Sequence, residues 1–200
     1  MNYLNVVMFS PEDLNIVKGS PNIRRRFIDS AISQLYPSYL ATLMEYNKVL
    51  NQKNSLLRSA KMSGKNVRDT LWIWNEQLAS LAVRIMVARQ EFTDKIASGA
   101  EAVGKDISGE KLGIKYIPNI RLDALTAEEM CEYLNDHADR EIDASSSQYG
   151  IQRDDLEITV DGRDAKLFAS QGQQRTAALS MKIAQSEYIN DLKGEYPILL

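Results

Sequence analysis

The sequence contains little cysteine or histidine and no long hydrophobic run, and each scarcity argues against a class of protein. Its single cysteine, Cys131, cannot form an internal disulfide, which is typical of a protein from a reducing compartment. Cys131 and His137 have no further partners at ligand spacing, so we interpret both as ordinary helix residues and expect no metal site. No run of about 18 apolar residues could span a bilayer. The opening MNYLNVVMFS also lacks the charged and apolar regions of a signal peptide, which predicts a cytoplasmic protein.

Charge is distributed unevenly along the chain. Overall, 24 Lys and Arg residues stand against 27 Asp and Glu residues, which says nothing by itself about nucleic acid. Residues 1–70 hold ten basic and five acidic residues, whereas the remainder is acidic. This asymmetry indicates that the first third faces an anionic partner, although a charged face is more often merely solvated. With 44% apolar residues, the 200 residues suffice for one domain or two small ones with a sizeable core.

The first 35 residues carry start signals for a strand and two helices. The apolar run LNVVMF is typical of a strand, and Ser10-Pro11 begins a short helix that should stop at Gly19. Ser20-Pro21 then starts a second helix. A basic cluster stands at the beginning of this second helix: Arg24, Arg25 and Arg26.

Two periodic stripes predict a pair of long helices. Mainly apolar residues are spaced alternately by three and four from Tyr36 to Leu57, and the same spacing runs from Leu71 to Phe92. A polar stretch with Gly64 as its turn separates them. Residues 36–98 are therefore expected to form an antiparallel helical hairpin in which each helix buries its stripe against the other. Two core helices of a bundle would give the same pattern, and both interpretations stay open.

Residues 99–200 are predicted to contain a small β component. The helical pattern weakens at the start of this segment, GIKYIPNI is typical of a strand, and Thr126 caps a helix that runs to about Ile142. Asp161-Gly162, between alternating runs, is the strongest short-range hairpin signal available. The chain is thus expected to have an α+β fold, predominantly α, with a long antiparallel helical hairpin and a small β component.

The stretch FASQGQQRT, residues 168–176, joins this hairpin to a final helix that is predicted from about Gln173 to Leu192, with Gly194 as its cap. Free N–H groups at a helix start carry partial positive charge, glycine lets an oxyanion approach the backbone, and a serine hydroxyl adds a donor. Glutamines and an arginine occupy the first turn, where acids would be usual, and this leaves the helix end open for an outside anion. A simple serine-capped helix carries the same signal, so both interpretations stay open.

The motif Ser170-Gln-Gly-Gln-Gln-Arg, with a helix and the apolar run PILL after it, resembles the signature motif of ABC-type ATPases in the spelling SQGQQRT of the RecF family of recombination and DNA-repair proteins. The resemblance covers essentially the whole chain. SMC-type heads spell the signature closer to Ser-Gly-Gly, so Gln171 favours RecF, and an SMC-type head fragment remains an alternative. Other stretches agree with the RecF family: VVMFSPEDLNIVKGSPNIRRRFID, YPSYLATLMEYNKVLNQKNSLL, RDDLEITVDG and GEYPILL.

The resemblance also implies what this sequence omits. RecF-like proteins carry a P-loop, G-x-x-x-x-G-K-[ST], and no such motif occurs here. The Walker B strand would be truncated after GEYPILL, before its magnesium-binding acids. The chain is therefore similar to the middle segment, lobe II, excised from an ABC-type ATPase head. Its implied parts are an entry strand with short helices (1–35), the hairpin arm (36–98) and a β-containing part with the signature helix (99–200).

One position departs from the RecF pattern. Where the family commonly has Gly-Pro-His-Arg-Asp-Asp, this sequence has Gly150-Ile-Gln-Arg-Asp-Asp155. Whatever the histidine contributes in the family cannot be carried over to Gln152.

By resemblance, the nucleotide site is shared between two chains. The signature of one ABC protomer closes over the ATP held by the P-loop of the other, which implies an ATP-dependent homodimer. ATP and Mg²⁺ would be bound mainly by parts outside this segment. No catalytic residue is implied, and the segment alone should not hydrolyse ATP, whereas its parent would be a weak DNA-dependent ATPase. The implied ATP contacts are Ser170, Gln171, Gly172, Gln173, Gln174 and Arg175, with Ser170 and the Gly172 and Gln173 amides at the γ-phosphate.

The resemblance further implies recombinational DNA repair, replication restart and the SOS response, with duplex DNA at gaps or junctions and a RecR-type mediator protein as partners. The alternative from a different class is a helical docking module for DNA or protein that needs no nucleotide. The basic first third supplies candidate phosphate contacts: Arg24, Arg25, Arg26, Lys61, Lys65 and Arg68.

Overall fold

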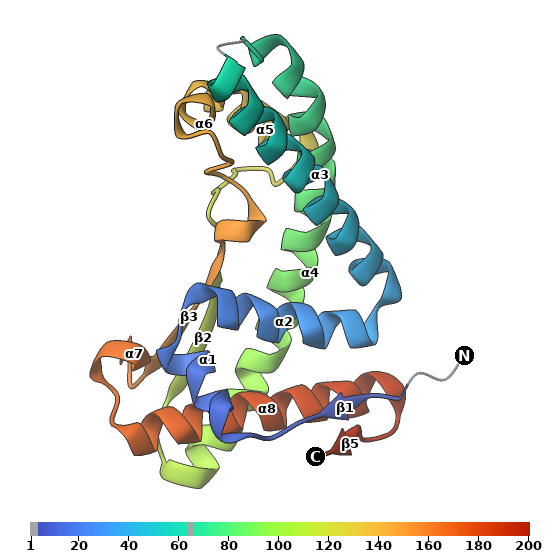
Figure 1. The fold of residues 1–200 in the computed structure, drawn as a ribbon. Coiled ribbons are helices and arrows are strands. Elements are labelled where there is room, and N and C mark those ends of the chain that lie inside the picture. Colours follow the sequence, from blue (N-terminus) through green and yellow to red (C-terminus); the bar gives the residue numbers. More distant parts are fainter. Residues whose placement is uncertain (1–3, 64–65) are drawn as a thin grey trace. The chain divides into compact units, whose positions relative to one another are not determined.

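The computed structural model describes residues 4–63 and 66–200, and its fold is predominantly helical with a small β component, as predicted (Figure 1). Two compact units are assembled from separate stretches of the chain. The first unit comprises residues 1–37, 89–117 and 155–200, and the second comprises 38–88 and 118–154. The division into three consecutive parts that the sequence predicts, 1–35, 36–98 and 99–200, stays a prediction.

The first unit combines helices of different lengths with all the strands that are paired within the described residues. Helix α8 runs alongside β1 and α1 (Figure 1). Its helices are η1 (Pro11–Asp13), α1 (Leu14–Lys18), α2 (Pro21–Leu35), α7 (Ala165–Phe168), α8 (Gln171–Lys193) and the C-terminal part of α4 (Arg68–Ser108). Its strands are β1 (Val6–Val7), β2 (Leu112–Ile117), β3 (Asp155–Val160), β4 (Arg163–Asp164) and β5 (Ile198–Leu199).

The strands form two small sheets. Strands β2, β3 and β4 are antiparallel neighbours, while β1 pairs in parallel with β5. The hairpin predicted at Asp161-Gly162 is confirmed: both residues have positive φ, 49° and 76°, as a type I′ turn requires. The returning strand is shorter than predicted, because Asp164 ends it by accepting a hydrogen bond from the Leu167 N–H at 2.9 Å and starting the single-turn helix α7.

Helix α4 is longer than the sequence pattern predicted. The periodicity weakens after Gly99, yet the helix continues to Ser108. A Cβ at Gly99 would lie 3.2 Å from the Ala184 Cβ, and one at Gly104 would lie 3.4 Å from the Leu112 Cβ. These glycines therefore let α8 and β2 approach α4 closely, and they do not end the helix.

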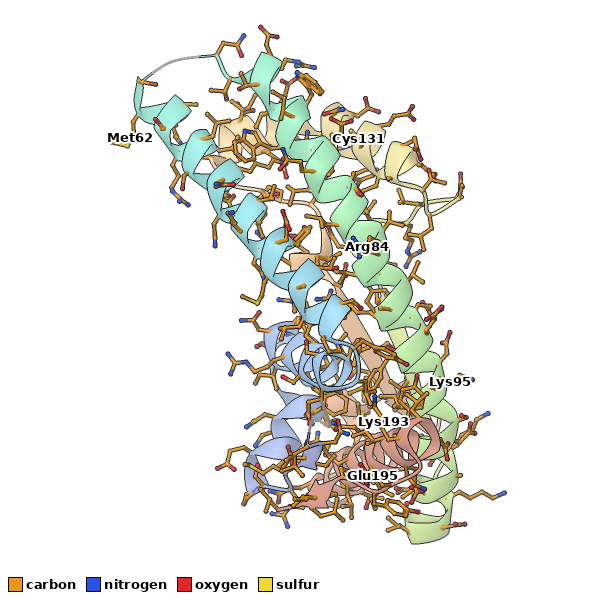
Figure 2. All side chains as sticks on the ribbon, turned by 90° about the vertical axis from the view of Figure 1, so that its right-hand side faces the viewer. Met62, Arg84, Lys95, Cys131, Lys193 and Glu195 are labelled. Atoms are coloured by element: carbon orange, nitrogen blue, oxygen red, sulfur yellow. The ribbon has the colours of Figure 1, made fainter. Side chains whose placement is uncertain are left out.

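The second unit is built around a helical hairpin, α3 (Pro37–Ser63) and the N-terminal part of α4, which lie side by side (Figure 2). The expected turn residue Gly64 lies outside the described residues. Residues of α3, α4 and α6, with Val67 just before α4, form a buried apolar cluster: Leu57, Ala60, Val67, Leu71 and Ala138. The remaining helices are α5 (Ala127–Asp136), α6 (Ala138–Ala144) and η2 (Ile151–Arg153).

The helix predicted from Thr126 to Ile142 is divided at His137. Thr126 caps α5 as expected, accepting the Glu129 N–H at 3.2 Å. The chain then turns at His137, whose ring stacks on Tyr133 at 4.1 Å between centroids and lies 4.7 Å from the ring of Tyr149. Aromatic packing thus holds the break between α5 and α6, and no local breaker residue marks it in the sequence.

A buried ion pair lies inside the second unit. Lys53, which falls in the predicted apolar stripe, and Glu141 are both fully buried, with 2.5 Å between Nζ and Oε2. Burial lowers the pKa of the Lys53 ammonium, and the opposite charge and hydrogen bond of Glu141 partly offset this shift. The other carboxylate oxygen accepts hydrogen bonds from the Ser147 hydroxyl and the Gln148 N–H, both at 2.8 Å, so Glu141 links α3 to the segment after α6.

Within the described residues, no helix is long and apolar enough to cross a membrane. No group of three or more His, Cys, Asp or Glu side chains in the same part of the chain is arranged to hold a metal ion.

Candidate functional site

Ser170 is the N-cap of α8, and its capping geometry is complete. Its φ of −62° and ψ of 162° are extended, and its Oγ accepts the Gln173 N–H at 3.2 Å. The Gln173 Oε1 accepts the Ser170 N–H in return at 2.7 Å. This reciprocal capping box fixes the first turn of α8. It leaves the Ser170 hydroxyl proton free to be donated, together with the N–H groups of Gln171 and Gly172, which have no acceptor within the helix.

The glutamine side chains secure the turn from both sides. The Gln173 Nε2 donates to the Glu110 Oε1 at 2.8 Å. The Gln174 Nε2 donates to the carbonyls of Ala165 at 3.1 Å and Ala169 at 3.3 Å, which ties α7 to α8. A glutamate could not donate either set of bonds. The sequence suggested that glutamines stand here, in place of acids, to leave the helix end open for an outside anion. The hydrogen bonds that Gln173 and Gln174 donate are a second, structural reason for them.

The helix start is open to solvent. Ser170, Gln171, Gly172 and Arg175 are all exposed. A Cβ at Gly172 would meet nothing nearer than the Ser170 Oγ at 3.8 Å, so no packing inside the described protein requires glycine there. Glycine in a helix costs up to about 1 kcal/mol relative to alanine. The space beside Gly172 is therefore open within the described protein.

A cleft extends from Arg175, within the motif, along one face of α8. It has a volume of about 540 Å³, and Arg175 and Lys182 lie on its α8 side. Asp13 pairs with Lys182 at 3.7 Å. The opposite wall includes Phe9 and Leu14. Sequence reasoning did not single out Lys182, although its spacing of seven residues from Arg175 places both cations on one helical face.

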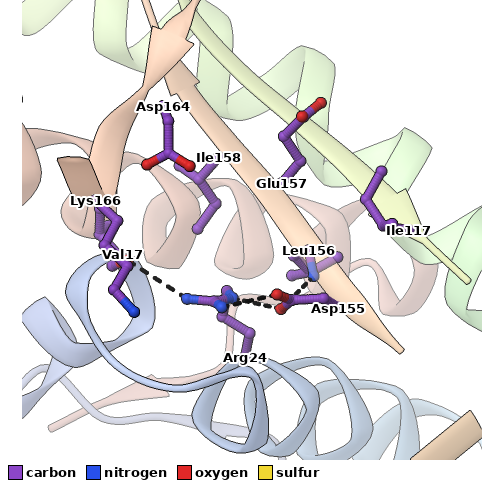
Figure 3. Close-up of a pocket in the computed structure, with 9 residues that line it drawn as sticks. All are labelled: Val17, Arg24, Ile117, Asp155, Leu156, Glu157, Ile158, Asp164 and Lys166. Carbon is purple, nitrogen blue, oxygen red and sulfur yellow. Dashed lines mark hydrogen bonds and ion pairs between the residues drawn. The ribbon is translucent and has the colours of Figure 1, made fainter. Parts of the chain in front are cut away.

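Arg24 is not available to a DNA phosphate. It is 6% exposed, and its Nε and Nη2 make a bidentate ion pair with Asp155 at 2.6 and 2.9 Å. Its Nη1 donates to the Gly19 carbonyl at 3.0 Å. Arg24, Asp155 and Lys166 are among the residues that line a cavity of about 230 Å³, and Figure 3 shows the ion pair there. We therefore remove Arg24 from the candidate DNA contacts, because its guanidinium is buried and bonded to Asp155 and Gly19 within the first unit.

The other basic candidates differ in exposure and in unit. In the first unit, Arg26 is exposed, and Arg25 is half-buried with a 2.8 Å hydrogen bond to the Asn22 Oδ1. In the second unit, Lys61 is exposed, and Arg68 is exposed but pairs with Asp139. Lys65 lies outside the described residues. The candidates thus form two groups, each described only within its own unit.

Comparison with known proteins identifies the family. No family model matches the sequence. The DNA replication and repair protein RecF of Staphylococcus carnosus is 43% identical over 207 aligned residues, covering 100% of this chain and 56% of that protein. RecF of Staphylococcus epidermidis and of Staphylococcus aureus strain JH9 are 41% and 42% identical with the same coverage. The chain belongs to the RecF family.

Solved RecF structures agree with this assignment. The structure of the recombination mediator protein RecF-ATPrS in the RecFOR pathway matches with a TM-score of 0.92 and 34% identity, covering 99% of this chain and 54% of that one. The corresponding RecF-ATP structure matches with a TM-score of 0.91. This RecF-family chain therefore spans little more than half the length of the relatives that it matches.

The position that departs from the usual RecF pattern has a structural role. The Gln152 Oε1 accepts the Tyr46 hydroxyl at 2.6 Å, and its Nε2 donates to the Tyr149 carbonyl at 2.7 Å. A Cβ at Gly150, which has a φ of 123°, would come within 2.5 Å of the Tyr46 Oη. Gln152 thus joins α3 to the segment that precedes η2, inside the second unit of this RecF-family chain.

Proposed function

We propose that this chain supplies the signature half of an ATP site in a RecF-family protein that acts in DNA replication and recombinational repair. The observation that carries the proposal is the helix start of α8, which is fixed by a capping box, exposed, and opened by a glycine that internal packing does not require. The similar RecF proteins named with ATP and ATPrS support ATP as the anion.

The residues present fit a γ-phosphate. An anion at a helix N-terminus is stabilised by the partial positive charge of the first-turn N–H groups. The Ser170 hydroxyl and the Gln171 and Gly172 N–H groups are free to donate to it, and Arg175 adds positive charge one turn further along. The Gln173 N–H, which the resemblance also assigned to the phosphate, already donates to the Ser170 Oγ. It would therefore act on the phosphate only indirectly, by holding the Ser170 hydroxyl in place.

The site is half of a pair. By the resemblance to ABC-type ATPases, the phosphates would be held by the P-loop of another full-length protomer, and closure would bury them between two chains. Loss of the γ-phosphate by hydrolysis would remove the anion that the α8 start stabilises and would weaken the dimer. ATP, with Mg²⁺ bound by parts outside this segment, would then act as a switch for holding DNA. The chain alone would not hydrolyse ATP.

The proposed setting is a DNA complex in the cytoplasm. Duplex DNA at gaps or junctions would be the nucleic acid, and a RecR-type mediator would be the protein partner. The RecFOR pathway named for the similar structures supports this setting.

A substitution at Ser170 tests the proposal. In the full-length protein, ATP should drive dimerisation, and Ser170→Arg should abolish it, because the arginine replaces the hydroxyl donor and fills the space beside Gly172. Dimer formation is measured by analytical ultracentrifugation with and without a non-hydrolysable ATP analogue. Nucleotide-dependent dimerisation that survives Ser170→Arg would overturn the proposal.

A further inference from the structure

One glutamine side chain connects the start of α8 to an acidic residue distant in the sequence. The Gln173 amide accepts the Ser170 N–H with Oε1 at 2.7 Å and donates to the Glu110 carboxylate with Nε2 at 2.8 Å. Glu110 stands 63 positions earlier in the chain, just before β2. All three residues belong to the first unit.

Only one orientation of the Gln173 amide satisfies both neighbours. A backbone N–H can only donate and a carboxylate can only accept. Turning the amide over would set Nε2 against the Ser170 N–H and Oε1 against the Glu110 carboxylate, so both hydrogen bonds would be lost. Glu110 therefore selects the orientation in which Gln173 caps Ser170.

Glu110 is itself held in place. Its second carboxylate oxygen, Oε2, accepts the Ser108 hydroxyl at 2.9 Å. Gly109, between them, has a φ of 76°, which glycine adopts readily and which turns the chain at the end of α4. The hydrogen bond from Ser108 and the turn at Gly109 thus position the Glu110 carboxylate independently of Gln173.

We propose that Glu110 is a positioning residue for the anion site: through Gln173 it keeps the Ser170 hydroxyl and the first-turn N–H groups of α8 in the geometry that receives a phosphate. The inference rests on the proposed function of this site. It adds that the geometry of the site is set by a residue outside the signature motif, at the junction of α4 and β2.

Removal of the carboxylate is the first test. In the full-length protein, Glu110→Ala should raise the ATP concentration for half-maximal dimerisation about five- to tenfold, the effect of losing a hydrogen bond to a charged group. Glu110→Gln, which can still present an oxygen to Gln173, should raise it about twofold. Asp106→Ala removes an exposed acid one turn earlier and should have no effect. The melting temperature without nucleotide is recorded for each variant, because replacing a residue that only stabilises the fold would lower this temperature and leave the ATP concentration for half-maximal dimerisation unchanged.

Exchange of the two side chains is the decisive test. Gln173→Glu alone places two carboxylates at hydrogen-bond distance and should weaken ATP-dependent dimerisation more than Glu110→Ala does. Adding Glu110→Gln restores a donor opposite Glu at position 173, which can still accept the Ser170 N–H, so the double variant should recover to within about threefold of wild type.

The two proposals fail in different ways. If wild-type protein dimerises with ATP and Ser170→Arg abolishes this, but Glu110→Ala matches wild type or the exchanged pair does not recover, the positioning role of Glu110 is wrong. If wild-type protein does not dimerise with ATP at all, the proposed function itself is wrong.

Discussion

At the scale of single residues, Gln173 explains why an acid is absent from the third position of α8. A glutamate there could accept the Ser170 N–H, as in the usual capping box, but it would face the Glu110 carboxylate across 2.8 Å. An amide can accept from one neighbour and donate to the other. The outside anion inferred from the sequence and this internal network favour the same residue, so composition alone could not separate the two reasons.

Substitution of Gly172 should affect the free energy of unfolding and ATP-dependent dimerisation in opposite directions. Gly172→Ala should raise the free energy of unfolding by about 0.5 kcal/mol, because alanine restricts the unfolded chain and a Cβ there meets no close neighbour. The same methyl group stands where the phosphate would approach, so the ATP concentration for dimerisation should rise at least about tenfold, roughly 1.4 kcal/mol. Urea unfolding and ultracentrifugation measure the two effects.

A matched control for that substitution is Ser98→Ala in α4. Ser98 is exposed and far along the sequence from the motif, and alanine again has the higher helix propensity. It should stabilise the protein by a similar amount and leave dimerisation unchanged. Equal effects of both substitutions on dimerisation would contradict the assignment of Gly172 to the site.

At the scale of elements, α3 depends on the ion pair between Lys53 and Glu141. Lys53→Met keeps much of the apolar stem but leaves the Glu141 carboxylate buried without its counter-charge. The cost should be about 3 kcal/mol, the usual penalty for removing one partner of a buried pair. Lys48→Met changes an exposed lysine of the same helix and should stay within about 0.5 kcal/mol of wild type.

Both tryptophans of the chain, Trp72 and Trp74, lie in the second unit, so their fluorescence during urea unfolding reports on the part that contains the pair. A loss below about 1 kcal/mol for Lys53→Met would mean that Glu141 is satisfied by its other donors, chiefly Ser147 and Gln148.

The parts of the fold that the sequence predicted have local causes. Ser20-Pro21 starts α2, Gly194 ends α8 with a φ of 72°, and Asp161-Gly162 makes the hairpin turn, because backbone preference alone decides these positions. The motif at Ser170 was recognisable for the same reason: its capping chemistry lies within four residues.

The parts that the sequence missed have partners far away in the chain. In the sequence, Gly99 resembles the end of a helix. In the structure, the helix continues and Ala184 packs closely against Gly99. In the sequence, Arg24 is one of three consecutive arginines and cannot be told from its neighbours. In the structure it is buried in an ion pair with Asp155, 131 positions later. Glu110 carries no local signal at all, because its role exists only where Gln173 meets it. Such long-range contacts leave no trace in a single sequence.

At the scale of the whole molecule, the charge asymmetry of the sequence becomes a polarised surface within the second unit. From Tyr46 onward, α3 carries no acid, and its exposed side chains include Lys48, Arg58 and Lys61. Helices α5 and α6 present a row of exposed acids instead: Glu128, Glu132, Asp136, Asp139 and Asp143. A DNA backbone would be attracted to α3 and repelled from α5 and α6.

Charge reversal near the hairpin turn tests this surface. Lys61→Glu together with Arg68→Glu should weaken duplex binding roughly tenfold or more in about 50 mM salt and should reduce the slope of log affinity against log salt by about two, one for each lost phosphate contact. The matched control is Lys95→Glu with Lys105→Glu, the same charge change on exposed residues of α4 in the first unit. Fluorescence anisotropy over a salt series measures both.

A third variant sharpens the result. Asp139→Asn releases Arg68 from its ion pair, so affinity should rise about two- to threefold if Arg68 reaches a phosphate. In nucleotide-free protein, Ser170→Arg should leave DNA binding unchanged, because the role proposed for the motif is to contact ATP and not DNA. Equal losses from both charge-reversed pairs would mean that net charge alone draws the protein to DNA. If, with ATP present, DNA binding is unaffected by Lys61→Glu with Arg68→Glu but is lost with Ser170→Arg, the duplex is held only by the ATP-closed dimer, and the docking role of the hairpin would have to be abandoned.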